Sequence, residues 1–185
     1  MLGVSTPLLY RSVRRPGFSV SPDADGVTLA VTSHEDKHPI YEDLLWQGAR
    51  PERGDRASRE GFKVVVLCDD EFQPSRHSFT DVRILKCPLV DTSMKPVPPA
   101  ELETMLKTAR RVARRVADGE KVLVTCYAGI NRSGLVVAHA LHHLTGWGGD
   151  RIVDHIRSKR PIALTNRLFV QMIRSLPELP ARSSV

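Results

Sequence analysis

Short β-branched runs alternate along this chain with longer runs in which apolar residues recur every three or four positions. The clearest short runs, KVVVLC and KVLVTC, are bounded by charged residues, as buried strands often are. Turn-forming residues bound three weaker runs of the same kind. The pattern predicts strands near residues 27–32, 44–48, 63–68, 82–88 and 121–126.

Helical periodicity is strongest after the prolines of KPVPPAELETM. Apolar residues recur at helical spacing from Leu102 to Val116, and Gly119 ends the run. Further runs predict a short helix before Gly61 and three helices after KVLVTC, in SGLVVAHALHHLTG, GGDRIVDHIRSKRP and TNRLFVQMIRSL. Strands that alternate with helices predict an α/β fold: a single domain with a central, mainly parallel, twisted sheet flanked by helices.

A chain of 185 residues fits one domain. We expect a partly ordered arm at residues 1–26, the folded domain at 27–178 and a tail at 179–185. Near the start, arginines follow an apolar patch, which is the reverse of the order in a secretory signal, and no apolar stretch approaches the roughly 20 residues of a membrane span. We therefore expect a cytoplasmic protein without membrane contact, and a monomer.

The net charge of +6 suits an anionic partner, such as nucleic acid, an acidic lipid surface or a phosphorylated substrate. Much of this charge lies in ARRVARRVADG, where four arginines recur at helical spacing: Arg110, Arg111, Arg114 and Arg115. We interpret them as the solvated face of a helix in preference to a nucleic-acid site, because no zinc-finger, RNP-like or basic-zipper pattern accompanies them.

The three cysteines, Cys68, Cys87 and Cys126, are too few and odd in number for a disulfide framework, which predicts a reducing compartment. Cys126 lies in VTCYAGINRSG, where a strand leads into a helix that begins near Ser133. Helix amides without internal partners, together with the helix dipole, make such a turn an anion site. Gly129 tolerates a positive φ there, and Arg132 can hold two phosphate oxygens.

The same field favours the thiolate form of Cys126, and a thiolate beneath a bound phosphate is an in-line nucleophile. We therefore expect a phosphocysteine that water hydrolyses, with no cofactor or metal, because amides and Arg132 carry the phosphoryl charge. The leaving oxygen needs an acid and the water needs a base, and one carboxyl group can serve both. Asp91 opens a proline-bearing loop after a strand, but Asp69 and Asp70 also follow a strand, so position alone leaves the choice open.

CYAGINRSG resembles the signature of the protein tyrosine phosphatase superfamily, most closely that of its compact dual-specificity branch: cysteine, five residues, arginine, then serine or threonine. LLWQGARP, CPLVD and SKRPIALTNRLFVQMI resemble the family's early strand, general-acid loop and closing segment, so the resemblance spans about residues 27–177. It implies Cys126 as nucleophile, Arg132 as phosphate clamp and Asp91 as general acid and then base. Ser133 would donate a hydrogen bond to the leaving thiolate.

The resemblance also implies a phosphate-binding loop (P-loop) that takes substrate phosphate, or sulfate or vanadate in its place. Its residues would be Tyr127, Ala128, Gly129, Ile130, Asn131 and Arg132. Thr125 stands where the family usually has histidine. Its hydroxyl can hydrogen-bond the loop backbone but carries no charge, so we expect a less activated thiol and slower turnover.

A phosphatase that acts on phosphotyrosine, and on phosphoserine or phosphothreonine, in proteins is the favoured function. The variable loop residues include no cation, which does not favour polyanionic lipids. The pair NR before the serine resembles the RNA 5′-triphosphatase branch and leaves an RNA substrate open. The alternatives are therefore an RNA 5′-triphosphatase, an inositol-phosphate phosphatase, or a pseudophosphatase that binds phosphorylated partners without turnover.

VVVLCDDE resembles the strand that carries a second cysteine in kinase-associated phosphatase and in phosphoinositide phosphatases. The resemblance makes Cys68 a candidate redox partner of Cys126, and a buried core residue is the alternative. We expect Cys87 to be structural.

Two groups of histidines are candidates for metal binding or substrate recognition. His139, His142 and His143 have a spacing that metal sites also use, but on an apolar helix we expect some of them to pack, others to face solvent, and none to bind a metal. The segment SHEDKHP is expected to form a loop near the site, where His34 and His38 are candidates for substrate recognition.

Overall fold

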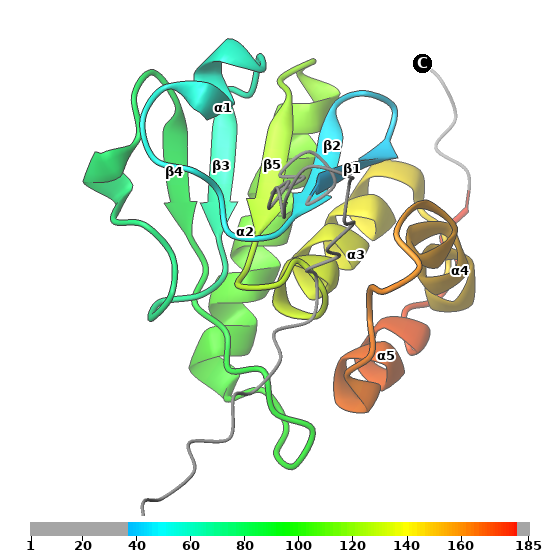
Figure 1. Ribbon diagram of the computed structural model, residues 1–185. Coiled ribbons are helices and arrows are strands. Elements are labelled where there is room, and N and C mark those ends of the chain that lie inside the picture. Colours follow the sequence, from blue (N-terminus) through cyan, green and yellow to red (C-terminus); the bar gives the residue numbers. More distant parts are fainter. Residues whose placement is uncertain (1–36, 181–185) are drawn as a thin grey trace, which may run out of the picture. The chain divides into compact units, whose positions relative to one another are not determined.

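A computed structural model describes residues 37–180, and the structural statements below concern these residues. Five strands form one sheet in the order β1-β2-β5-β3-β4 (Figure 1). β1 pairs with β2 in antiparallel fashion, and the other three pairings are parallel. The mainly parallel α/β sheet expected from the sequence is thereby confirmed. The strands are Lys37–Tyr41 (β1), Leu45–Gly48 (β2), Val64–Leu67 (β3), Arg83–Lys86 (β4) and Val122–Thr125 (β5).

The helices expected from the apolar periodicity are present. They are Arg56–Arg59 (α1), Pro99–Ala117 (α2), Arg132–Thr145 (α3), Gly149–Lys159 (α4) and Arg167–Arg174 (α5), with a 3₁₀ turn at Arg76–Ser78. α2, α3, α4 and α5 contribute to one hydrophobic cluster with one face of the sheet, and α1 packs against the other face. None of the helices in the described residues is long and apolar enough to cross a bilayer.

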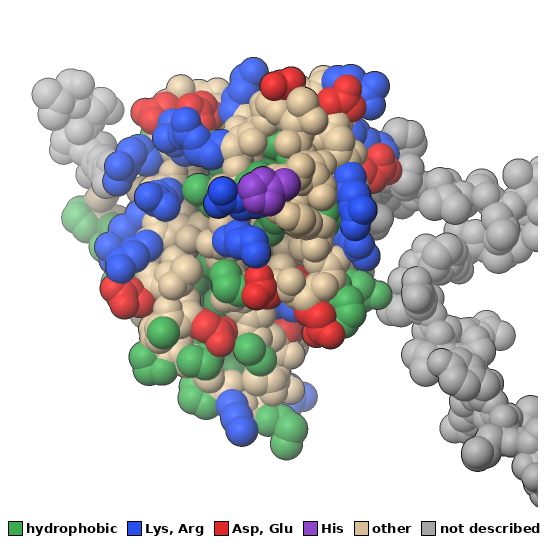
Figure 2. Space-filling model, turned by 90° about the vertical axis from the view of Figure 1, so that its left-hand side faces the viewer, with side chains coloured by type: hydrophobic (Ala, Val, Ile, Leu, Met, Phe, Trp, Pro, Cys, Tyr) green, Lys and Arg blue, Asp and Glu red, His purple; other side chains and the backbone are tan. Residues whose placement is uncertain are grey.

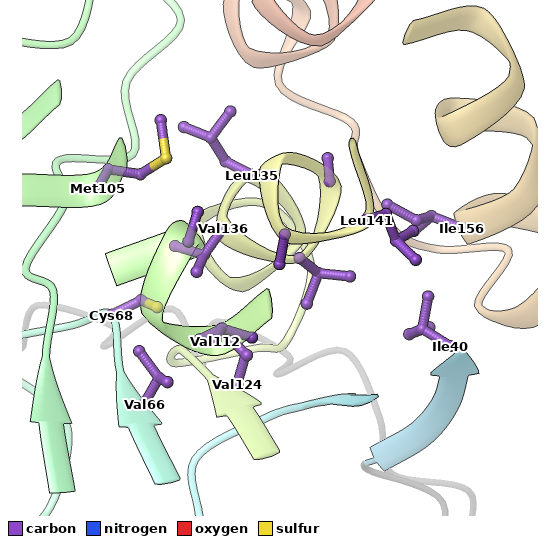
Figure 3. Packing of buried hydrophobic residues seen from close by; sticks show 14 of the residues in the cluster. Ile40, Val66, Cys68, Met105, Val112, Val124, Leu135, Val136, Leu141 and Ile156 are labelled. Carbon is purple, nitrogen blue, oxygen red and sulfur yellow. The ribbon is translucent and has the colours of Figure 1, made fainter. Parts of the chain in front are cut away.

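The two central strands, β3 and β5, are buried on both faces. Val66 and Val124 point toward α2 and α3, where they meet Val112 and Val136 (Figure 3). Leu123 points to the opposite face and packs in the cluster around Ala57 and Phe62 of the α1 region. Since successive side chains of a strand face opposite sides, burial of both faces explains why these strands read as continuous apolar runs.

β1 was not expected from the sequence. His38 lies in this strand, so the prediction of a loop for SHEDKHP is wrong for this residue. KHPIY is polar at its start and contains Pro39, which lacks a backbone donor, and such a residue is tolerated on an edge strand such as β1. His34, the strand near 27–32 and the arm at 1–26 lie outside the described residues, as do residues 181–185 of the tail. The predicted domain bounds stay a prediction.

Candidate active site

The carboxyl ends of β3 and β5 lie side by side, because Leu67 pairs with Thr125 at the last position of each strand. The loop of residues 126–131 continues from β5 and leads into α3. Within it, Cys126 is buried, and its Sγ lies 3.4 Å from the hydroxyl of the buried Ser133 in the first turn of α3. The loop therefore folds back so that the thiol faces the start of the helix, at the end of the sheet where α/β proteins bind ligands.

The backbone amides of this loop have no hydrogen-bond partner among the described residues, from residue 127 to residue 132. The loop carbonyls, in contrast, are held by donors from other segments. Arg50 N donates to the carbonyl of Tyr127 at 3.2 Å, and Leu164 N donates to that of Ile130 at 3.0 Å. With the carbonyls fixed in this way, a run of unpartnered amides at a helix start makes an anion-binding nest.

Gly129 is required by this geometry. Its φ is +66°, a region that side chains disfavour, and a Cβ at this position would lie 2.5 Å from the carbonyl carbon of Gly48. The loop can approach β2 this closely only with glycine at residue 129.

Two buried polar side chains hydrogen-bond to the loop carbonyls, and neither was predicted from the sequence as a site residue. Gln47 of β2 donates to the carbonyl of Gly129 at 2.9 Å. Arg160 donates to the same carbonyl at 2.8 Å and to that of Ala128 at 3.2 Å. A third contact of Arg160 reaches Nδ1 of His38 at 2.7 Å, and since guanidinium only donates, His38 accepts. His38 therefore helps to hold Arg160, which in turn holds the loop.

Arg132 is held by Asp69, which follows β3. The two side chains form an ion pair of 3.0 Å, with 17% and 2% of their side-chain surfaces exposed. Asp69 itself accepts hydrogen bonds from the amides of Glu71 and Phe72, which fix its carboxylate in a turn. The Nε of Arg132 is buried and has no hydrogen-bond partner. The guanidinium is therefore oriented on one side and retains a donor that an oxyanion can use.

Asp91 is exposed and lies against the loop. Its carboxylate accepts hydrogen bonds from Asn131 at 3.1 Å and from Asn166 at 2.8 Å. Asn131 also accepts from the backbone amides of Thr165 and Asn166, so one amide side chain joins the loop of residues 126–131 to the segment that leads into α5. Of the other two carboxyl candidates, Asp69 is committed to Arg132, and Asp70 is exposed and pairs with Lys86 at 3.2 Å.

The Thr125 hydroxyl does not bond the loop backbone, so this expectation was wrong. It donates to the carbonyl of Val66 in β3 at 2.8 Å and accepts from Gln73 at 2.7 Å. Gln73 in turn accepts from the amide of Asp69 at 3.0 Å. Because Thr125 is the last residue of β5, its side chain reaches the neighbouring strand, and it connects β5 with the turn that holds Asp69.

Aromatic side chains mark one rim of the site. Tyr127 and Phe72 are each 46% exposed and meet edge to face, with 5.3 Å between ring centroids. Phe72 comes from the turn after β3, so this rim joins the loops that follow two neighbouring strands.

All three cysteines are buried and none forms a disulfide. Burial raises the pKa of Cys68 well above its ordinary value, and the neighbouring Cys87 and Cys126 raise it further, against a lowering effect of Arg132. Cys68 is therefore a neutral thiol close to both other cysteines. Its pairing with Cys126 under oxidation stays a prediction.

His139 and His142 of α3 are buried, and His143 is partly exposed. Burial lowers the pKa of His139 to about 4, and the nearby His143 and His142 lower it as well. His142 contacts the carbonyl of Trp147 at 2.9 Å. Within residues 37–180, no group of three or more His, Cys, Asp or Glu side chains is arranged to hold a metal ion.

The family model for the dual specificity phosphatase catalytic domain matches residues 45–178. Among curated proteins, protein phosphatase Slingshot homolog 3 of Rattus norvegicus is 30% identical over 138 residues, which are 74% of this chain and 20% of that protein. Human dual specificity protein phosphatase 15 is 27% identical over 121 residues, 64% of this chain and 38% of that protein. The chain thus spans well under half the length of either relative.

Solved structures show the same fold. Tk-PTP in its active form superposes with a TM-score of 0.64 at 23% identity, over 77% of this chain and 97% of that one. PTPMT1 in complex with PI(5)P gives 0.63 at 18% identity, over 77% and 94%. Human DUSP28 gives 0.61 at 21% identity, over 75% and 93%. Together with the family match over most of the described residues, these findings assign the chain to the dual-specificity phosphatase catalytic domains of the protein tyrosine phosphatase superfamily.

Proposed function

We propose that this protein hydrolyses phosphotyrosine, and also phosphoserine and phosphothreonine, in other proteins through a phosphocysteine intermediate. The observation that carries the proposal is the position of the Cys126 thiol in a loop whose amides are unpartnered and whose Arg132 retains a buried, unpartnered Nε. A tetrahedral dianion in this loop would receive donors around its non-bridging oxygens and a sulfur nucleophile on the side opposite the leaving group.

In the first step, the Cys126 thiolate attacks phosphorus, and the bond from phosphorus to the leaving oxygen breaks. Asp91, protonated at this stage, gives its proton to that oxygen, so that a neutral phenol or alcohol departs. The amides of residues 127–132 and the Arg132 guanidinium would stabilise the charge on the remaining oxygens. The hydrogen bonds from Asn131 and Asn166 hold the Asp91 carboxyl beside the loop.

In the second step, Asp91 is a carboxylate and takes a proton from water. The water oxygen attacks phosphorus, the sulfur–phosphorus bond breaks, and inorganic phosphate and the Cys126 thiolate are released. The Ser133 hydroxyl, 3.4 Å from Sγ, would donate a hydrogen bond to the departing thiolate and keep its own proton. Each group then has the protonation state with which it began.

The rim of the site supports a protein substrate. Tyr127 and Phe72 offer exposed aromatic surface on which the ring of a phosphotyrosine can pack. The variable loop positions Tyr127, Ala128, Ile130 and Asn131 supply no cation for the additional phosphates of an inositol phosphate or an RNA 5′-triphosphate. The likeness to PTPMT1 bound to PI(5)P concerns the fold.

The test is hydrolysis of para-nitrophenyl phosphate by the purified protein in the presence of EDTA, beside Cys126→Ser and Asp91→Asn. We expect turnover that Cys126→Ser abolishes and Asp91→Asn slows strongly. A wild type without turnover that still binds vanadate would make the protein a pseudophosphatase. Competition against a phosphotyrosine peptide by inositol phosphates or triphosphorylated RNA would reassign the substrate if either competes at lower concentration than the peptide itself.

A further inference from the structure

A cluster of arginines surrounds a hollow on the side of the molecule formed by β4 and α2. The hollow has a volume of about 480 Å³, and its lining residues are Arg83, Leu85, Arg111, Arg114, Arg115 and Asp118. Figure 2 looks toward the β4 edge of the sheet and shows lysine and arginine side chains gathered on this face. We call this feature the arginine hollow.

Most of the positive charge in the arginine hollow is not neutralised within residues 37–180. Arg115 pairs with Glu120 at 3.0 Å. Arg83, Arg111 and Arg114 are exposed and form no ion pair in the described part of the chain, and the only carboxylate in the lining belongs to Asp118. Like charges held together in a concave surface raise the local potential and favour an anionic ligand.

The arginine hollow lies at the opposite end of the sheet from the catalytic loop. Arg83 is the first residue of β4 and pairs with Val64, the first residue of β3, whereas Cys126 follows the last residue of β5. Arg111 and Arg114 come from the last turns of α2, shortly before the chain enters β5. A ligand in the hollow would therefore bind apart from the substrate phosphate.

The backbone of β4, next to the hollow, indicates which kind of anion would bind there. β4 is the last strand of the sheet on this side. The amides of Arg83 and Cys87 donate toward β3, so strand alternation directs those of Ile84 and Lys86 outward, and neither has a backbone partner among the described residues. Outward amides and carbonyls along an edge can pair with another strand, whereas a nucleic acid or a lipid headgroup makes no use of them in this way.

We propose that the arginine hollow and the β4 edge together bind an extended acidic segment of a protein partner. Its backbone would pair with β4 as an added strand. Carboxylates at alternate positions would lie on one face, beside Arg83 and Leu85, and reach Arg111 and Arg114. This proposal does not rest on the phosphatase reaction, because binding requires no turnover.

The test uses the full chain and a labelled peptide of alternating glutamate and valine, without phosphate, in a fluorescence anisotropy titration at about 0.15 M salt. We expect saturable binding that Arg111→Glu combined with Arg114→Glu weakens by at least about tenfold. Arg110→Glu is the matched control: it is an exposed arginine on the same helix that does not line the hollow, and we expect a change of less than about threefold. Hydrogen exchange should show protection of the Ile84 and Lys86 amides by the peptide.

Three outcomes would overturn the proposal. One is no binding of the peptide, or equal binding by the double variant and the wild type. Another is arginine-dependent binding of inositol hexakisphosphate or single-stranded RNA in place of the peptide. The third is peptide binding that leaves the amides of Ile84 and Lys86 exchanging as before, because strand addition at β4 would then not occur.

Discussion

The carboxylate of Asp69 lies 3.0 Å from the guanidinium of Arg132, at the point where the turn after β3 meets the loop after β5. Both side chains are largely buried, and Asp69 is fixed by the amides of Glu71 and Phe72. A buried cation with a fixed counter-ion is pre-oriented, so Arg132 does not need to be ordered when phosphate binds. In the proposed mechanism Asp69 is a positioning residue that acts through Arg132.

Asp69→Asn should impair phosphate binding and turnover together. The amide keeps the shape of the side chain but removes the charge that orients Arg132, and we expect kcat/KM to fall by roughly tenfold or more. Weaker inhibition by vanadate should accompany the loss, because vanadate uses the same guanidinium. Asp70→Asn, which changes an exposed carboxylate paired with Lys86, is the control and should stay within about twofold. Equal effects of the two substitutions would contradict the role of Asp69.

Asn166→Asp should separate the two functions of Asn166. Its Oδ1 accepts hydrogen bonds from the amides of Leu168 and Phe169 at the start of α5, while its Nδ2 donates to Asp91. An aspartate retains the cap but repels Asp91. We therefore expect a melting temperature within about 2 °C of the wild type and slower turnover.

Substrate chemistry provides the readout for this variant. Phenyl phosphate has a poor leaving group and depends on the general acid, so its kcat should fall by about tenfold or more, and that of para-nitrophenyl phosphate by less. Asn166→Ala is the comparison and should lose about 1 kcal/mol of stability with the cap. Equal slowing of both substrates by Asn166→Asp would show that Asn166 does not act through proton transfer.

Features that depend on residues close together in the chain could be predicted from the sequence. β3 and β5 were predicted because burial on both faces leaves a continuous apolar run, and α2 because its buried residues keep helical spacing. Cys126 and Ser133 meet because the spacing within a single turn brings them together. The short strand β1, which is polar at its start, was missed because its pairing with β2 comes from tertiary structure.

The supports of the loop could not be predicted, because they join residues far apart in the chain. Gln47 reaches Gly129 across 82 positions and Arg160 reaches it across 31, and no periodicity links such pairs. One sequence feature could have indicated Arg160: it is the arginine of the Arg-Pro pair in SKRPIALTNRLFVQMI. The error at Thr125 has a similar origin: the partner of its hydroxyl is set by the register of β5 against β3, which brings the carbonyl of Val66 within reach.

Arg160→Met should destabilise the protein and loosen the loop of residues 126–131. The substitution leaves the buried carbonyl of Gly129 and the partly buried carbonyl of Ala128 without the donors of Arg160, and we expect the free energy of unfolding in urea to fall by about 2–4 kcal/mol. Arg160→Lys, which keeps the charge and one donor, should lose less. Arg167→Met, at an exposed arginine that starts α5, is the control, and a loss of stability as large as that of Arg160→Met would show that the loop contacts are not the cause.

Thr125→Val should reduce stability without changing side-chain shape. It removes the hydroxyl that joins Val66 and Gln73. The buried carbonyl of Val66 and the partly buried side-chain amide of Gln73 then have one partner fewer, so we expect a loss of about 1–2 kcal/mol in urea denaturation. Thr125→Ser keeps the hydroxyl and should recover most of this loss. If serine and valine destabilise the protein equally, the hydrogen bonds of Thr125 do not contribute to stability.

His139 should make folding sensitive to mild acid. Its pKa in the folded protein is about 4, below the ordinary 6.5, mainly because of burial. Between these two values the unfolded chain binds a proton that the folded protein does not, so acid favours unfolding. The contribution of neutral His139 is therefore complete above pH 6.5 and is lost as the pH falls toward 4.

His139→Leu removes this proton linkage. All other titrating groups are shared with the wild type, so the difference between the two proteins isolates His139. From neutral pH to the lower end of this window, the wild type should lose about 2–3 kcal/mol more than the variant in urea denaturation. His77→Gln, at an exposed histidine of the 3₁₀ turn, should leave the pH dependence of the wild type unchanged. Parallel stability curves for wild type and His139→Leu would mean that His139 is protonated as readily in the folded protein as in the unfolded chain.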